Sequence, residues 1–100
     1  MIRFAPQALT DIERIFEFNL HRDPATAHLH IDRIRSAVMV LDEHPKIGRR
    51  YSLANPLREL VISYGRTGYV ALYVHREIDE LITIVAIKHQ REAGYRDRSR

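Results

Sequence analysis

The protein has 100 residues and a mass of 11.7 kDa, which indicates a single domain over residues 1–100. Its 45% hydrophobic and 29% charged residues are typical of a globular protein and exclude a wholly disordered chain, and the absence of cysteine excludes a disulfide scaffold, a thiolate zinc site and a cysteine nucleophile. The N-terminus lacks the long apolar run of a signal peptide and no segment approaches the roughly 18 apolar residues of a membrane span, so we expect a cytoplasmic protein with no membrane partner.

The net charge of +3 is concentrated at the C-terminus. Residues 88–100 hold five basic and two acidic side chains, and from about residue 92 they form a basic tail. A second basic window runs from Lys46 to Arg66, with five basic side chains against Glu59. If the two windows are adjacent in the fold, they form a positive surface suited to an acidic partner or a nucleic acid. Otherwise they are a solvated tail and an arginine-rich loop.

The chain begins with a short alternating segment, Met1 to Phe4, that favours a strand. The next segment predicts a helix from Ala5-Pro6 to near His21. Its apolar residues recur at helical spacing: Ala8, Leu9, Ile12, Ile15, Phe16 and Leu20. The opposite side of this helix is expected to carry Gln7, Asp11, Arg14 and Glu17.

A second helix is predicted from Asp23-Pro24, where Asp23 can cap the exposed amides and Pro24 suits the first turn. Its apolar stripe consists of Ala27, Ile31, Ile34, Val38 and Leu41. Pro45 and Gly48 end it. The short link between the helices favours an antiparallel helical hairpin.

Residues 45–57 are expected to form a loop, after which the period changes to that of strands at 58–64, 69–75 and 81–88. The links are too short for crossovers, so these strands are antiparallel. Tyr69, Ala71, Tyr73 and His75 share one face of the middle strand, and the last strand, apolar on both faces, should be central. The predicted fold is therefore α+β, in the order β-α-α-β-β-β, with the helical hairpin on an antiparallel sheet of about four strands.

Six histidines raise the possibility of a metal site. His28 and His30 lie two apart on the second helix, and His21 and His44 lie near helix ends. No pair has the i, i+4 spacing of a helical zinc site, so these are interpreted as surface or helix-end residues. We expect neither a metal ion nor a cofactor.

His89 is the exception, because it follows the last strand in Lys88-His89-Gln90-Arg91. There it can act as a general acid or base on RNA beside arginines, or simply hold the tail against the sheet. Arg58 can bind a phosphate or an acidic partner, or form a surface ion pair. The tyrosines at 64, 69, 73 and 95 can stack on bases or complete a sheet face.

Several pieces, in order and at their spacings, resemble the ParE/RelE superfamily of toxins from bacterial type II toxin–antitoxin systems. They are Phe4-Ala5-Pro6-Gln7-Ala8, Asp23-Pro24 with the long helix ending at His44-Pro45, Ile47-Gly48-Arg49, Arg58-Glu59-Leu60, and Ile87-Lys88-His89-Gln90-Arg91. The resemblance covers nearly the whole chain. It implies the same fold, a helical hairpin on an antiparallel sheet, and a cognate antitoxin that neutralises the toxin.

The resemblance implies two rival activities, since RelE-like members cut mRNA in the ribosomal A site and ParE-like members poison DNA gyrase. RelE-like nucleases place lysines in the strand that here reads Glu59-Leu60-Val61-Ile62, and an arginine where Val70 follows Gly68-Tyr69. These basic positions are absent, which favours the ParE-like branch and a binding toxin over an enzyme. A non-toxic binding module of the same fold is a third possibility.

The resulting site hypothesis assigns partner binding to Arg49, Arg58, Tyr73, His89 and Arg91. The expected partners are the antitoxin and DNA gyrase. Under the alternative, the ribosome and mRNA replace gyrase, and the candidate catalytic residues are His89, Arg91 and Tyr95.

Overall fold

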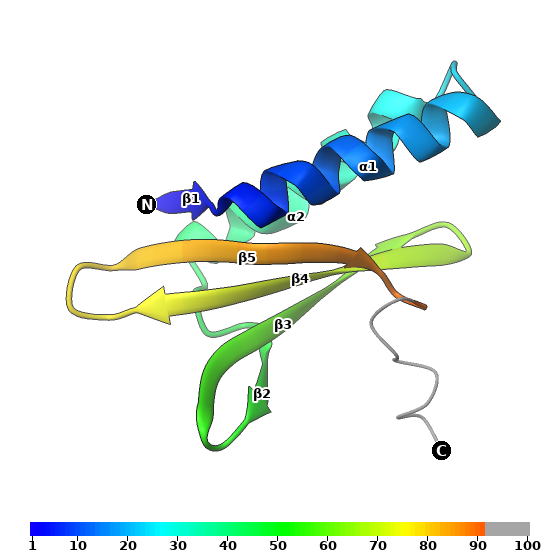
Figure 1. Ribbon diagram of the computed structural model, residues 1–100. Coiled ribbons are helices and arrows are strands. Elements are labelled where there is room, and N and C mark those ends of the chain that lie inside the picture. Colours follow the sequence, from blue (N-terminus) through cyan, green and yellow to red (C-terminus); the bar gives the residue numbers. More distant parts are fainter. Residues whose placement is uncertain (92–100) are drawn as a thin grey trace.

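Two helices cover one face of a five-stranded sheet in a computed structural model that describes residues 1–91 (Figure 1). The strand order is β1-β5-β4-β3-β2. The elements are β1 (Ile2–Phe4), α1 (Pro6–Arg22), α2 (Ala27–Met39), the 3-10 helix η1 (Val40–Asp42), β2 (Arg49–Ser52), β3 (Asn55–Tyr64), β4 (Thr67–Arg76) and β5 (Leu81–His89). The α+β prediction is confirmed. The expected tail at 92–100, with Tyr95, lies outside the described residues.

The strand at the N-terminus pairs in parallel with β5, while the other strand pairs are antiparallel. β5 is central, as its apolar faces predicted, because β1 flanks it on one side and β4 on the other. β1 spans only three residues, so the β5 edge beyond Ile84 needs other hydrogen-bond partners.

The loop expected at 45–57 is wrong in part, because it contains β2 and the start of β3. All four residues of β2 are exposed, so the strand lacks the apolar alternation by which a strand is recognised. Its pairing with β3 comes from the backbone, with an irregular register between Arg50 and Ser52.

The side of α1 that faces the sheet differs from the expected one. Asp11 and Asn19 are buried beside Ala8 and Ile15, while Leu9 and Leu20 are exposed. The Asp11 carboxylate accepts a hydrogen bond from the backbone N–H of Ile87, at 2.9 Å, on the β5 edge that β1 does not reach. A polar residue is therefore buried because it satisfies a strand amide.

α2 begins at Ala27 rather than at Asp23-Pro24. The Asp23 side chain accepts a hydrogen bond from the Thr26 hydroxyl at 2.8 Å, which stabilises the link between the helices rather than capping α2. Ile34 and Val38 then enter the core, with Leu41 of η1. Neither helix within residues 1–91 has the length and apolar character of a transmembrane segment.

Candidate functional site: a basic cleft beside the end of the sheet

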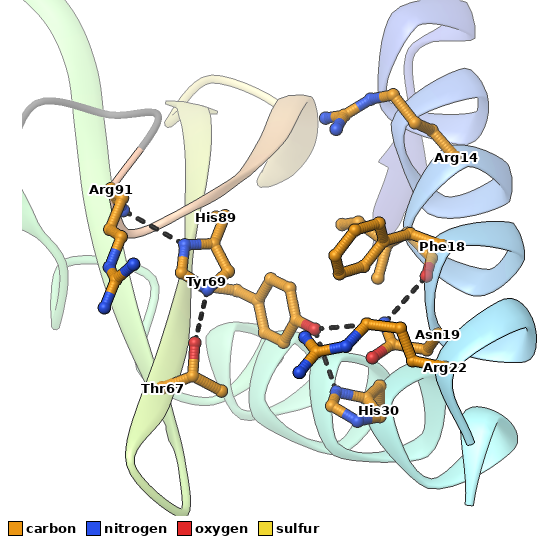
Figure 2. A pocket seen from close by; sticks show the side chains of 10 residues that line it. Arg14, Phe18, Asn19, Arg22, His30, Thr67, Tyr69, His89 and Arg91 are labelled. Atoms are coloured by element: carbon orange, nitrogen blue, oxygen red, sulfur yellow. Dashed lines mark hydrogen bonds between the residues drawn. The ribbon is translucent and has the colours of Figure 1, made fainter.

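A cleft of about 310 Å³ lies between α1, the start of α2 and the ends of β4 and β5 (Figure 2). Among residues 1–91, its lining contains three arginines and two histidines but no carboxylate. The residues of this basic cleft are Arg14, Ile15, Phe18, Asn19, Arg22, His30, Thr67, Tyr69, His89 and Arg91. Several donors and an aromatic ring therefore share one concave site.

One wall of the basic cleft is a stripe of α1. Arg14, Phe18 and Arg22 follow one another at intervals of four residues, so they lie on the same face of the helix (Figure 2). The Arg22 guanidinium lies 5.3 Å from the centre of the Phe18 ring, within cation–π distance. Arg14 approaches the Asp11 carboxylate at 3.8 Å. This spacing is visible in the sequence, although it was not recognised there as the wall of a site.

A buried polar chain closes the back of the basic cleft. The Tyr69 hydroxyl lies 2.8 Å from His30 Nδ1 and 3.5 Å from the Asn19 side-chain nitrogen. An amide nitrogen can only donate, so the hydroxyl accepts from Asn19 and its own hydrogen is available to His30. The His30 ring also lies 4.3 Å from the ring of Tyr64. His30 is half-buried, which corrects its interpretation as a surface histidine.

The pKa shifts of His30 and Tyr69 agree with this hydrogen-bonded arrangement. Burial lowers the pKa of His30, the positive charge of Arg22 lowers it further, and Asp23 acts in the opposite direction. Burial raises the pKa of Tyr69, against the hydrogen bond from Asn19. The neutral imidazole and the protonated phenol are therefore both favoured.

His89 lies on the opposite wall, where both of its ring nitrogens have partners. The backbone N–H of Arg91 donates to Nδ1 at 3.2 Å, so the hydrogen of the neutral ring is on Nε2. Nε2 forms a hydrogen bond with the Thr67 hydroxyl of β4, and the ring meets Tyr69 edge-on at 5.7 Å. This arrangement joins the end of β5 to β4. It leaves His89 without an unoccupied lone pair for proton abstraction.

Of the alternatives considered for Arg58, a surface ion pair is not found within residues 1–91. The Arg58 guanidinium instead donates to the backbone carbonyls of Gly48, at 2.7 Å, and Lys46, at 3.2 Å. Arg49 is the residue that pairs with Glu59, at 3.2 Å, across β2 and β3. The Glu59 side chain is buried, although glutamate is rarely buried unless it is paired.

Tyr73 is fully buried, at 0% exposure, so in this structure its side chain has no surface to offer a partner. Its hydroxyl donates to the Pro45 carbonyl at 2.7 Å and accepts from the Gly48 N–H at 2.9 Å. A Cβ at position 48 would lie 2.5 Å from that hydroxyl, which explains the glycine. Tyr73 and Arg58 thus hold the segment before β2, which we name the 45–48 loop.

The structure therefore divides the expected site residues between two places. His89 and Arg91 line the basic cleft, whereas Arg49, Arg58 and Tyr73 surround the 45–48 loop. Of the second basic window, Arg66 reaches a cavity that adjoins the cleft. Residues 1–91 contain no cluster of three or more possible metal ligands.

Comparison with known proteins identifies the class. The family model described as the ParE toxin of the type II toxin–antitoxin system parDE matches residues 2–94, so the chain belongs to this toxin family. This confirms the resemblance inferred from the sequence motifs.

Two relatives illustrate the similarity. The curated protein Toxin RelE3 of Caulobacter vibrioides is 34% identical over 91 residues, which cover 91% of this chain and 95% of that protein. The solved structure titled "Chromosomal ParDE TA system from P. aeruginosa" matches with a TM-score of 0.74 at 19% identity, covering 88% of this chain and 92% of that one. At that identity the structural match supports the fold alone.

Proposed function

We propose that this toxin is ParE-like, that it inhibits DNA gyrase, and that a cognate antitoxin neutralises it. The observation that carries the proposal is the sheet face turned away from the helices. The positions at which RelE-like nucleases would keep basic residues hold Glu59, Val61 and Val70. Glu59 is a buried carboxylate, and such a group opposes the negative charge that develops during phosphodiester cleavage.

The state of His89 supports the same choice. A general base needs an unoccupied lone pair within reach of the proton that it removes. In His89, Nδ1 accepts from the backbone and Nε2 contacts Thr67. This residue is thus better suited to positioning the end of β5 than to proton transfer.

The alternative is a RelE-like, ribosome-dependent mRNA endonuclease. The relative with 34% identity carries the name RelE3, and His89 and Arg91 share the basic cleft. A non-toxic binding module of the same fold is the third candidate.

The antitoxin would have a suitable apolar surface on the open face of the sheet. The helices cover the other face (Figure 1). On the open face Val61 is 45% exposed, and Leu72 and Val74 are half-buried. An antitoxin segment that folds onto these residues would stabilise the toxin by about 2.7 kcal/mol when its free concentration is a hundred times Kd. The melting temperature should therefore rise with excess antitoxin.

Two assays on the purified full chain test the choice of target. We expect inhibition of gyrase supercoiling and intact mRNA on programmed ribosomes. The matched pair His89→Ala and His28→Ala separates a role of His89 from the general loss of a histidine, because His28 is exposed on α2. Codon-specific mRNA cleavage that His89→Ala abolishes and His28→Ala retains would overturn the gyrase proposal. In cells, filamentation with a DNA-damage response is expected rather than an arrest of translation.

A further inference from the structure

We propose that the basic cleft binds one nucleotide unit, with its phosphate on Arg22 and Arg91 and its base against the ring of Phe18. The two arginines come from α1 and from the residue pair after β5, and Phe18 lies one helical turn from Arg22 (Figure 2). The ligand can be a free nucleotide or one unit of a single strand, since both present the same phosphate and base. The inference does not depend on gyrase being the target.

Charge supports the phosphate position. Of the acidic residues near the basic cleft, Asp11 lies beneath Arg14 and binds the Ile87 amide, and Asp23 lines only the adjoining cavity. Within residues 1–91, the Arg22 guanidinium contacts the Phe18 ring and is not paired with a carboxylate. Its charge acts on the cleft, because it contributes to lowering the pKa of His30. A phosphate there would meet planar guanidinium donors, which match its oxygen atoms in pairs.

The exposed ring supports the base position. Phe18 is 57% exposed, although Ile15, one turn before it, and Asn19, the next residue, are buried. An aromatic ring beside arginines is the combination by which proteins hold unpaired bases, because stacking needs only a flat face and the backbone needs only positive charge. An acidic peptide would use the arginines but would gain no comparable contact from the ring.

The size of the site supports a nucleotide unit. The basic cleft has a volume of about 310 Å³, which is at the lower end of the range for small-molecule sites. A cavity of about 400 Å³ adjoins it, shares Arg22 and His30 with it, and adds Arg66. A single strand could thus place its next phosphate near Arg66. Since both nitrogens of His89 are occupied, the inference concerns binding and not cleavage.

Fluorescence anisotropy with a fluorescein-labelled deoxythymidine hexanucleotide tests the proposal on the full chain. Arg22→Gln and Arg91→Gln should each weaken binding about tenfold, since each removes a charged hydrogen bond. The salt dependence, as the slope of log K against log salt, should fall by about 0.7 for each lost contact. Arg35→Gln is the matched control, because Arg35 is exposed on α2 outside the cleft, and it should bind as the parent does.

Competition identifies the ligand. Thymidine monophosphate should displace the labelled hexanucleotide better than inorganic phosphate does. Phe18→Leu should weaken the binding of thymidine monophosphate about tenfold and leave the binding of phosphate unchanged. If the monophosphate competes nearly as well as the hexanucleotide, the free nucleotide is the ligand. A hexanucleotide that binds much more tightly, and loses this advantage in Arg66→Gln, assigns the single strand. Either result supports the proposal.

Three results would overturn it. The first is equal displacement by phosphate and thymidine monophosphate in the parent, and the second is displacement by hexaglutamate as strong as that by the nucleotide. The third is a parent that binds neither the hexanucleotide nor thymidine monophosphate. Thermal melts of every variant accompany the titrations. Phe18 and Arg22 are exposed, so their variants should keep the parent's melting temperature, and the test remains decisive if one of them fails to fold.

Discussion

Replacing Tyr73 by phenylalanine should destabilise the protein strongly while removing a single oxygen atom. The lost hydroxyl accepts from the Gly48 N–H and donates to the Pro45 carbonyl. Gly48 is buried, so its amide would remain unsatisfied at a cost of about 1–3 kcal/mol, and the weaker loss at the half-buried carbonyl raises the sum to about 2–4 kcal/mol. For a domain of this size, this corresponds to a decrease in Tm of about 10–20 °C.

Urea denaturation followed by circular dichroism measures this effect. The midpoint should fall while the m-value is unchanged, since Tyr73→Phe alters stability and not the surface exposed on unfolding. Tyr64→Phe is the matched control: its ring contacts His30, and no hydrogen bond of its hydroxyl is found within residues 1–91. It should cost less than about 0.5 kcal/mol. Equal losses in the two variants would refute the assignment of the Tyr73 hydroxyl as the anchor of the 45–48 loop.

Substitutions at three other positions test further features. Gly48→Ala should lower the urea midpoint, because its Cβ would lie 2.5 Å from the Tyr73 oxygen, and an unchanged midpoint would show that the 45–48 loop can move aside. Asp11→Ala should lower the free energy of unfolding by about 1–3 kcal/mol, because it leaves a strand amide unsatisfied. Asp11→Asn keeps an acceptor oxygen and should lower it less. The reverse order in urea denaturation would contradict this explanation. Because the native pKa of His30 is lowered, the unfolded chain binds more protons, and stability should fall as the pH drops below about 6.5. This fall should be smaller in His30→Gln, and an identical pH dependence in both proteins would exclude His30 as its source.

The elements that the sequence predicted correctly are those whose side chains report their environment directly. The apolar stripe predicted for α2 depends on burial, and three of its residues, Ile34, Val38 and Leu41, lie in the core. β2 escaped prediction because its four side chains are exposed, so that its pairing with β3 leaves no apolar alternation in the sequence. Asp11 was assigned to the wrong side of α1, since its partner is an amide 76 positions away.

The candidate site shows the same limit. The spacing of Arg14, Phe18 and Arg22 could have predicted one wall of the basic cleft, but the opposite wall follows only from the arrangement of β4 and β5. Tyr73 was grouped with Tyr69 and Ala71 on one face of its strand and assigned to partner binding, whereas the structure buries its side chain in the core. Periodicity indicates which face a residue occupies. It does not indicate that a loop will close over that face and use the hydroxyl.

The two groups of expected site residues lie toward different ends of one hairpin, and this separation allows their effects to be distinguished. Arg58 is paired with Tyr73 in the β3–β4 register beside the 45–48 loop, whereas Tyr64 is paired with Thr67 at the turn beside the basic cleft. Substitutions near the loop act through stability, because they release buried hydrogen bonds. Substitutions at exposed cleft residues such as Arg22 remove a potential contact and leave the core in place. A loss of toxicity at an unchanged urea midpoint therefore indicates a binding surface, and a loss that follows the midpoint indicates only a weakened fold.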